Sequence, residues 1–168
     1  MHLRPFLKQL EDQGKLVRIK KEVSVEYEIA NILYSLNENP VIFENVKDYP
    51  FPVFGGIASD RDIIAQGLGT TKEKLLQKLV DALRNPTVPE VVDNGPCQEV
   101  VIQNPDLRKL PLLFHLPGDG GRYATATVAT IKDPQTGRNV SYHRLMERDS
   151  HRFTARLIKG RQTRTTYD

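Results

Sequence analysis

The sequence predicts an α+β protein with an N-terminal α/β lobe over residues 1–96 and an antiparallel β-rich domain over residues 97–168. In the first lobe, apolar residues at helical spacing alternate with short apolar runs rich in β-branched residues. After a proline-containing segment at residues 85–96, three β-rich segments follow one another with turn residues between them. We therefore expect two domains, joined by the proline-containing segment.

The first lobe is expected to begin with a helix and to continue as alternating strands and helices. Leucines recur at helical spacing from Leu3 to Leu10, and Gly14 follows where a helix often ends on a left-handed residue. The first helix should therefore end near Gln13. A second helical pattern is ended by Pro40. The remaining expected elements are strands at 16–19, 41–43 and 51–54, and the second helix at 27–36.

Two more helices are expected before the linker, and one strand after it. Ser59 is the predicted N-cap of a helix that runs to Leu68, and Thr71 opens a second helix that ends before Asn85. Beyond the linker, residues 98–103 (QEVVIQ) are rich in β-branched side chains. They are therefore a strand candidate.

The most informative stretch is the antiparallel meander predicted over residues 122–162, whose strands are expected at 122–132, 138–144 and 152–162. The turn between the first two contains Asp-Pro and Thr-Gly. The second strand carries Asn139, Ser141, His143 and Arg144, which supply an amide, a hydroxyl, an imidazole and a guanidinium. These groups suit an anionic ligand that bears a phosphate. The cluster is therefore the candidate site.

Composition restricts the class of protein. The 168 residues have a formal net charge of +3 and an isoelectric point near 9.0, well short of the dense positive field of a dedicated nucleic-acid binder. The single cysteine, Cys97, cannot form an internal disulfide. The N-terminus has no apolar signal region, and no apolar run is long enough to span a membrane. A soluble cytoplasmic protein that binds a small anionic molecule is expected.

Several segments, in this order and spacing, resemble the UbiD-type decarboxylases, which use prenylated flavin mononucleotide (prenylated FMN). The resemblance covers nearly the whole chain and is carried by six segments: residues 3–7 (LRPFL), 14–19 (GKLVRI), 41–46 (VIFENV), 104–111 (NPDLRKLP), 117–121 (PGDGG) and 133–144 (DPQTGRNVSYHR). It implies that residues 97–168 are the first part of a flavin-binding split β-barrel.

The resemblance also implies site residues. Asn139 corresponds to a metal ligand that bridges to the flavin phosphate, and Arg144 corresponds to the catalytic arginine that holds the substrate carboxylate. Gln162 occupies the position of the family's metal-binding histidine, eighteen residues after Arg144, and is the second metal ligand that we expect. The implied cofactors are prenylated FMN, Mn²⁺ or Mg²⁺, and K⁺. The residues expected to bind the flavin are Asn139, Ser141, Tyr142, His143, Arg144, Arg161 and Gln162.

Two alternatives stay open for this cluster. Asn139 and Arg144 are five residues apart, so in a regular strand they project to opposite faces. Either a β-bulge intervenes, or the ligand wraps around the strand. Arg161 either meets the flavin phosphate or lies on a solvated face of the sheet.

The functional expectation is one part of a carboxy-lyase that non-oxidatively decarboxylates or carboxylates an aromatic or α,β-unsaturated acid. Family members are far longer than 168 residues, and no paired carboxylates occur near the candidate site. We therefore expect an N-terminal portion, a split subunit or a truncated form that is inactive alone. Its expected partners are a carboxylic acid substrate and the remainder of the enzyme or a second subunit, with a homo-oligomer when complete. The alternatives are a non-enzymatic flavin- or phosphate-binding module that serves a partner subunit, and a nucleic-acid binder that uses the arginines and aromatic residues of the meander.

Overall fold

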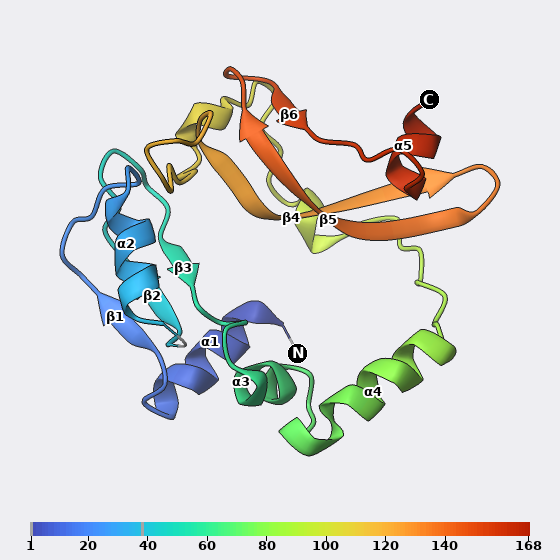
Figure 1. The fold of residues 1–168 in the computed structure, drawn as a ribbon, viewed down its shortest axis with the longest axis horizontal. Helices are drawn as coiled ribbons and strands as arrows, with labels where there is room; N and C mark the ends of the chain where they lie inside the picture. Colours follow the sequence, from blue (N-terminus) through green and yellow to red (C-terminus); the bar gives the residue numbers. More distant parts are fainter. Residues whose placement is uncertain (1, 38) are drawn as a thin grey trace. The chain divides into compact units, whose positions relative to one another are not determined.

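The computed structural model describes residues 2–37 and 39–168 (Figure 1). Helices and strands alternate in the first half, and a β-meander dominates the second half, which confirms the α+β class. The elements are α1 (Leu3–Asp12), β1 (Val17–Ile19), α2 (Glu28–Ser35), β2 (Val41–Phe43), β3 (Val53–Gly55), α3 (Arg61–Gly67), α4 (Lys72–Arg84), β4 (Tyr123–Asp133), β5 (Gly137–Glu147), β6 (Phe153–Ala155) and α5 (Gln162–Tyr167), with 3₁₀ turns at Pro96–Gln98 and Leu107–Lys109.

The chain divides into two compact units. Unit 1 comprises Met1–Glu22, Ile32–Val46 and Pro50–Asn104, and unit 2 comprises Val23–Asn31, Lys47–Tyr49 and Pro105–Asp168. No helix in the described part of the chain is both long enough and apolar enough to cross a bilayer.

Unit 1 contains a three-stranded sheet in the order β1–β2–β3. Strand β1 pairs in parallel with β2, with Val17 opposite Val41, and β2 pairs antiparallel with β3. A parallel pair needs a crossover connection, and α2 lies in that connection. Next to the sheet, Phe6 and Leu10 of α1 pack with Ile63 of α3 in a buried cluster. The apolar spacing of α1 therefore predicts its buried residues Phe6 and Leu10, while Leu3 at its start is exposed.

The helix ends of unit 1 confirm one expectation and correct another. Helix α1 ends at Asp12, with Gln13 as its C-cap, and Gly14 follows with a φ of +68°. The N-cap of α3 is Asp60 rather than Ser59, because the Asp60 carboxylate accepts from the backbone N–H groups of Asp62 and Ile63. The Ser59 hydroxyl instead donates to the Gly56 carbonyl at 2.5 Å.

The strand expected at residues 98–103 is wrong. Residues Pro96–Gln98 form a 3₁₀ turn, and the chain that follows belongs to no strand. Val100, Val101 and Ile102 are at least 68% exposed. Their β-branched side chains suit a strand, but a strand also needs a neighbour for its backbone hydrogen bonds, and none of the described strands pairs with this segment.

Unit 2 contains the predicted antiparallel meander, β4–β5–β6, as an open three-stranded sheet within the described residues. Strands β4 and β5 are joined by a tight turn, in which Gly137 has a φ of +82° that favours glycine. The third strand is shorter than expected: it covers only residues 153–155, and α5 begins at Gln162. Figure 1 shows α5 beside the β4–β5 hairpin, and α5 contacts β4.

Candidate functional site

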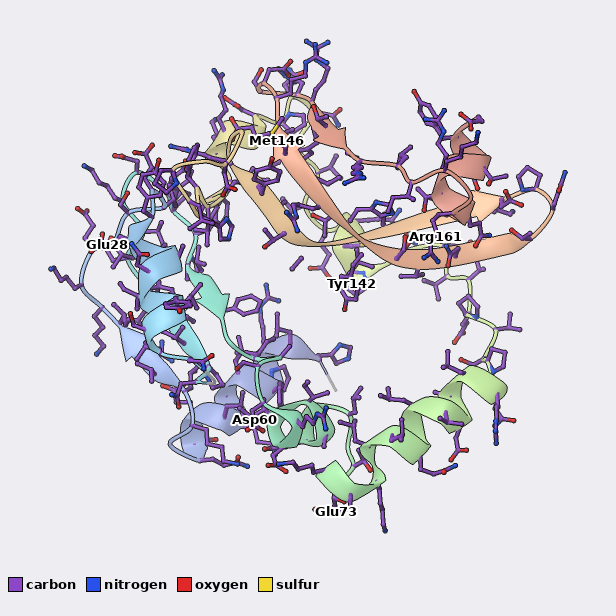
Figure 2. All side chains as sticks on the ribbon, viewed as in Figure 1. Glu28, Asp60, Glu73, Tyr142, Met146 and Arg161 are labelled. Atoms are coloured by element: carbon purple, nitrogen blue, oxygen red, sulfur yellow. The ribbon has the colours of Figure 1, made fainter. Side chains whose placement is uncertain are left out.

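A hollow of about 730 Å³ opens in unit 2 along β5 and the chain that follows β6. All seven residues selected from the sequence border this hollow: Asn139, Ser141, Tyr142, His143, Arg144, Arg161 and Gln162. Figure 2 shows two of these side chains, Tyr142 on β5 and Arg161 just before α5. The structure therefore brings the predicted residues together, while their roles stay predictions.

Four more residues that sequence reasoning did not select also border the hollow: Tyr123, Arg156, Ile158 and Thr163. Tyr123 begins β4, and the other three lie between β6 and the first turn of α5. Tyr123 reaches the hollow because β4 pairs with β5, and Arg156 because it directly follows β6, which pairs with the other edge of β5. The strand register, which the sequence does not show, determines this proximity.

A β-bulge lies directly beside Arg144. Strand β4 pairs with β5 through Ala124 opposite Leu145 and then through Thr127 opposite His143, so two residues of β4 face Arg144 alone. The Thr127 hydroxyl spans the bulge and donates to the Ala124 carbonyl at 3.4 Å. The irregularity lies in β4, and β5 keeps its alternation, with Asn139 half-buried and Arg144 exposed, so this bulge does not place the two side chains on one face of β5. Bulges increase the local twist and bend of a sheet, which re-aims nearby side chains.

Ser141 and His143 form a hydrogen-bonded group on the half-buried face of β5. The Ser141 hydroxyl lies 3.0 Å from Nε2 of His143, and this nitrogen also lies 3.3 Å from the Thr163 hydroxyl. One imidazole nitrogen is therefore engaged by two hydroxyl groups from different elements. This arrangement fixes the ring at the edge of the hollow.

Gln162 is held at the start of α5 by contacts with the β4–β5 turn. Its Nε2 donates to the Thr136 hydroxyl. That hydroxyl donates to the buried carboxylate of Asp133 at 2.9 Å. The backbone N–H groups of Thr136 and Gln135, and then the hydroxyls of Thr136 and Thr166, lower the pKa of Asp133 from 3.8 to about 2. Asp133 is therefore ionised at neutral pH and accepts hydrogen bonds only.

Three guanidinium groups border the hollow without a carboxylate partner among the described residues: Arg144, Arg156 and Arg161. The β5–β6 ladder ends at the pair Leu145 and Ala155, so Arg144 and Arg156 are the next residues along the two antiparallel strands. Like charges at neighbouring cross-strand positions are destabilising. None of the described residues that border the hollow is Asp or Glu. The hollow therefore favours an anionic ligand.

The hollow offers oxygen ligands to a metal through two amides, those of Asn139 and Gln162. No group of three or more His, Cys, Asp and Glu residues that could hold a metal occurs in the described part of the chain. Amide oxygens are hard donors that suit Mg²⁺ or Mn²⁺. The chain can therefore supply part of the coordination of such an ion, and a phosphate on the unpaired arginines can supply further oxygens.

Two family models match the chain in succession. Residues 7–83 match the 3-octaprenyl-4-hydroxybenzoate carboxy-lyase N-terminal domain, and residues 90–168 match the Rift-related domain of the same family. Among curated proteins, anhydromevalonate phosphate decarboxylase of Methanothermobacter thermautotrophicus is 34% identical over 93% of this chain and 36% of that protein. The chain spans about a third of the length of the curated relatives that it matches.

Solved structures give the same result. The UbiD-class enzyme HmfF of Pelotomaculum thermopropionicum, in an evolved dimeric form with prFMN, has a TM-score of 0.91 and 38% identity over 98% of this chain and 40% of that chain. Vanillic acid decarboxylase of Sedimentibacter hydroxybenzoicus has a TM-score of 0.88 and 27% identity over 97% of this chain and 38% of that chain. The two family matches together cover most of the chain and confirm the resemblance seen in its sequence: the protein belongs to the UbiD family of 3-octaprenyl-4-hydroxybenzoate carboxy-lyases.

Proposed function

We propose that this chain provides the flavin- and metal-binding part of a carboxy-lyase that non-oxidatively removes CO₂ from an aromatic or α,β-unsaturated acid, or adds CO₂ to one. The proposed cofactor is prenylated FMN, with Mn²⁺ or Mg²⁺ as the divalent metal and K⁺ as a further cation. Decarboxylase relatives support the reaction class. The solved structures of HmfF in complex with prFMN (prenylated FMN) and with FMN support a flavin as the cofactor.

The observation that carries the proposal is the set of unpaired guanidinium groups around two amide oxygens. Arg144 and Arg156 lie at neighbouring cross-strand positions without a carboxylate between them. A bound anion would remove this repulsion, because a guanidinium donates two parallel hydrogen bonds to a carboxylate or a phosphate. The charge of the hollow therefore matches a ligand pair of one phosphate and one carboxylate.

The seven residues at the hollow that were selected from the sequence have proposed roles. Arg144 holds the substrate carboxylate and Arg161 the flavin phosphate, while the amide oxygens of Asn139 and Gln162 coordinate the divalent cation. Prenylated FMN, when bound, would supply the electron sink for breaking the bond to the carboxylate. Ser141, Tyr142 and His143 line the flavin.

The same hollow explains why we propose no turnover by this chain alone. Decarboxylation leaves a carbon that must be protonated, and no carboxylic acid borders the hollow among the described residues. The remainder of the enzyme or a second subunit would supply that acid, in an assembly that is a homo-oligomer when complete. We further propose that the linker near residue 96 separates an N-terminal α/β domain from the flavin-binding domain, and that the protein acts in the cytoplasm.

Reconstitution tests the proposal. The purified chain is mixed with prenylated FMN and Mn²⁺ and passed through a desalting column, and its visible absorption spectrum is recorded. We expect the flavin to be retained by the chain and to be lost in the double variant Asn139→Ala with Arg161→Gln. CO₂ release from aromatic and α,β-unsaturated acids should be absent. A folded chain that retains no flavin would overturn the proposed cofactor site. CO₂ release by the chain alone would overturn the proposal that the chain lacks the acid needed for turnover.

A second candidate is a non-enzymatic module that binds a flavin or a phosphate for a partner subunit. It is favoured because no carboxylate borders the hollow in the part of the chain that the structure describes. The two candidates differ when the flavin-loaded chain is mixed with the remaining part of a UbiD-family enzyme. CO₂ release from the mixture supports a carboxy-lyase part, whereas flavin retention without CO₂ release supports the module.

A further inference from the structure

Asp133 is the one buried polar residue among the described residues, with 7% of its surface exposed. It lies at the end of β4 and begins the turn to β5. Its Oδ1 accepts from the backbone N–H of Gln135 at 2.9 Å and from that of Thr136 at 2.7 Å. These two bonds are those of an ordinary Asx turn. They explain an aspartate here, but they do not explain its remaining contacts.

The remaining contacts of Asp133 lead to α5. The Thr136 hydroxyl lies 2.9 Å from Oδ1, and the Thr166 hydroxyl lies 2.9 Å from Oδ2. The Thr166 hydroxyl also lies 2.9 Å from the backbone carbonyl of Gln162, and the Thr136 hydroxyl accepts from the side chain of Gln162. Asp133 is therefore linked to the side chain of Gln162 through Thr136, whereas the single hydrogen of the Thr166 hydroxyl goes either to Asp133 or to the Gln162 carbonyl.

The direction of these hydrogen bonds is fixed by the carboxylate. An ionised carboxylate only accepts, and a threonine hydroxyl has a single hydrogen. Thr136 must use that hydrogen on Asp133, so its oxygen can only accept from Gln162. Gln162 therefore turns its NH₂ group to Thr136, and its carbonyl oxygen Oε1 stays available as a ligand. The hydrogen bond that Nε2 of Gln162 donates to the Thr136 hydroxyl agrees with this order.

We propose that Asp133 is a positioning residue that sets the amide orientation of Gln162 through Thr136, so that Oε1 is presented to a hard divalent cation shared with Asn139. This inference rests on the proposed metal site. An amide binds a metal through its oxygen and not through its NH₂ group. The imidazole implied by the family can bind through either ring nitrogen. A chain with glutamine at this position therefore needs a neighbour that fixes which end faces the metal, and residues that hydrogen-bond to a metal ligand in this way tune metal affinity.

The test is Mn²⁺ binding by the full chain in the presence of FMN, followed by the electron paramagnetic resonance signal of free Mn²⁺. Thr136→Val removes the hydroxyl while the backbone bonds of the turn remain available. We expect it to weaken Mn²⁺ binding about tenfold, the low end of the range for removing a group that hydrogen-bonds to a metal ligand. Asp133→Asn should weaken binding at least as much. Thr165→Val is the matched control, because among the described residues the Thr165 hydroxyl hydrogen-bonds only to the Arg161 carbonyl, and it should change the affinity less than twofold.

Repeating the measurement in a Gln162→Glu chain shows whether Thr136 orients the Gln162 amide or only stabilises the local structure. In Gln162→Glu, both ends of the side chain are oxygen ligands, so the choice of end no longer matters. Thr136→Val should then change Mn²⁺ affinity less than twofold in the Gln162→Glu chain, although it costs about tenfold in the native chain. A purely structural role of Thr136 predicts the same loss in both backgrounds and would overturn the inference.

The outcomes distinguish this inference from the proposed function. Mn²⁺ binding that is lost in Asn139→Ala but unchanged in Thr136→Val overturns the positioning role of Asp133 and leaves the metal site standing. A folded native chain that binds no Mn²⁺ with FMN overturns both. Tenfold weakening in Thr136→Val that disappears in the Gln162→Glu background supports both.

Discussion

Asn139 and Arg144 border the same hollow, although they are five residues apart on β5. Alternation along a strand would place them on opposite faces, and Asn139 is indeed half-buried while Arg144 is exposed. The register break in β4, where two residues face Arg144, lies beside Arg144 and increases the local twist of the sheet, while β5 keeps its alternation. The hollow therefore borders both faces of β5 at this point.

The first prediction concerns Arg144. Arg144→Gln should weaken binding of 4-hydroxybenzoate to the flavin-loaded chain about tenfold or more, because a charge-assisted hydrogen bond contributes about 1.5–3 kcal/mol. The affinity of Arg144→Lys should lie between those of Arg144→Gln and the native chain, since an ammonium keeps the charge but not the paired donors. Isothermal titration calorimetry measures the affinity. Arg148→Gln, on an exposed arginine outside the hollow, is the control. Equal affinities for Arg144→Gln and the native chain would remove Arg144 from the site.

The second prediction concerns the metal ligand. Gln162→His should raise the affinity for Mn²⁺ about tenfold above pH 7, because a neutral imidazole is a better ligand for transition metals than an amide. Titration of Mn²⁺ with detection of the free ion gives the affinity. Thr165→His places the same imidazole on an exposed position of α5, outside the hollow. A gain in Thr165→His as large as that in Gln162→His would mean that the added imidazole binds Mn²⁺ wherever it stands.

The sequence predicted the elements whose evidence is local. Helix α1 and the β4–β5 hairpin follow from side-chain periodicity and turn residues, which act within a few positions. The N-cap of α3 differed by one residue, since Ser59 and Asp60 are both good caps and the choice depends on which side chain faces the first turn. The strand expected at residues 98–103 failed because pairing is not a local property.

In the candidate site, too, local features could be predicted from the sequence and long-range contacts could not. The residues on β5 could be named from one continuous motif, whereas Arg156 could not. Arg156 reaches Arg144 only through the register of β6 on β5, and a shift of one residue would turn it to the other face. The contact between Asp133 and Thr166 likewise joins residues 33 positions apart, through the folding of α5 onto the hairpin. Neither relationship has a signal within a single segment.

The third prediction concerns acid stability. The folded pKa of Asp133 is about 2, below its ordinary value of 3.8. The stability that its carboxylate contributes is therefore complete above about pH 4 and is lost as the pH falls through the folded pKa near 2. Urea unfolding of the native chain and of Asp133→Asn should show a difference in stability that is largest above pH 4 and shrinks toward pH 2. A difference that is constant over this range would mean that the Asp133 carboxylate is not the group that titrates.

The fourth prediction uses two glycines of unit 1. Gly14 and Gly56 have φ angles of +68° and +74°, so alanine is strained at both. An added methyl group at Gly14 meets no atom within 4 Å, whereas at Gly56 it would collide with the backbone carbonyl of Asn39. Gly14→Ala should therefore cost only the left-handed strain, about 1–2 kcal/mol.

Gly56→Ala should cost clearly more than Gly14→Ala, because the backbone beside Pro40 must move to admit the methyl group. That backbone leads into β2, where Val41 and Phe43 are fully buried, so the movement disturbs the centre of the first sheet. Urea midpoints of the two variants, compared at one pH, give the difference directly. If both variants unfold at the same midpoint, the close approach of Gly56 to Asn39 contributes nothing, and the conformation of the glycine alone determines its cost.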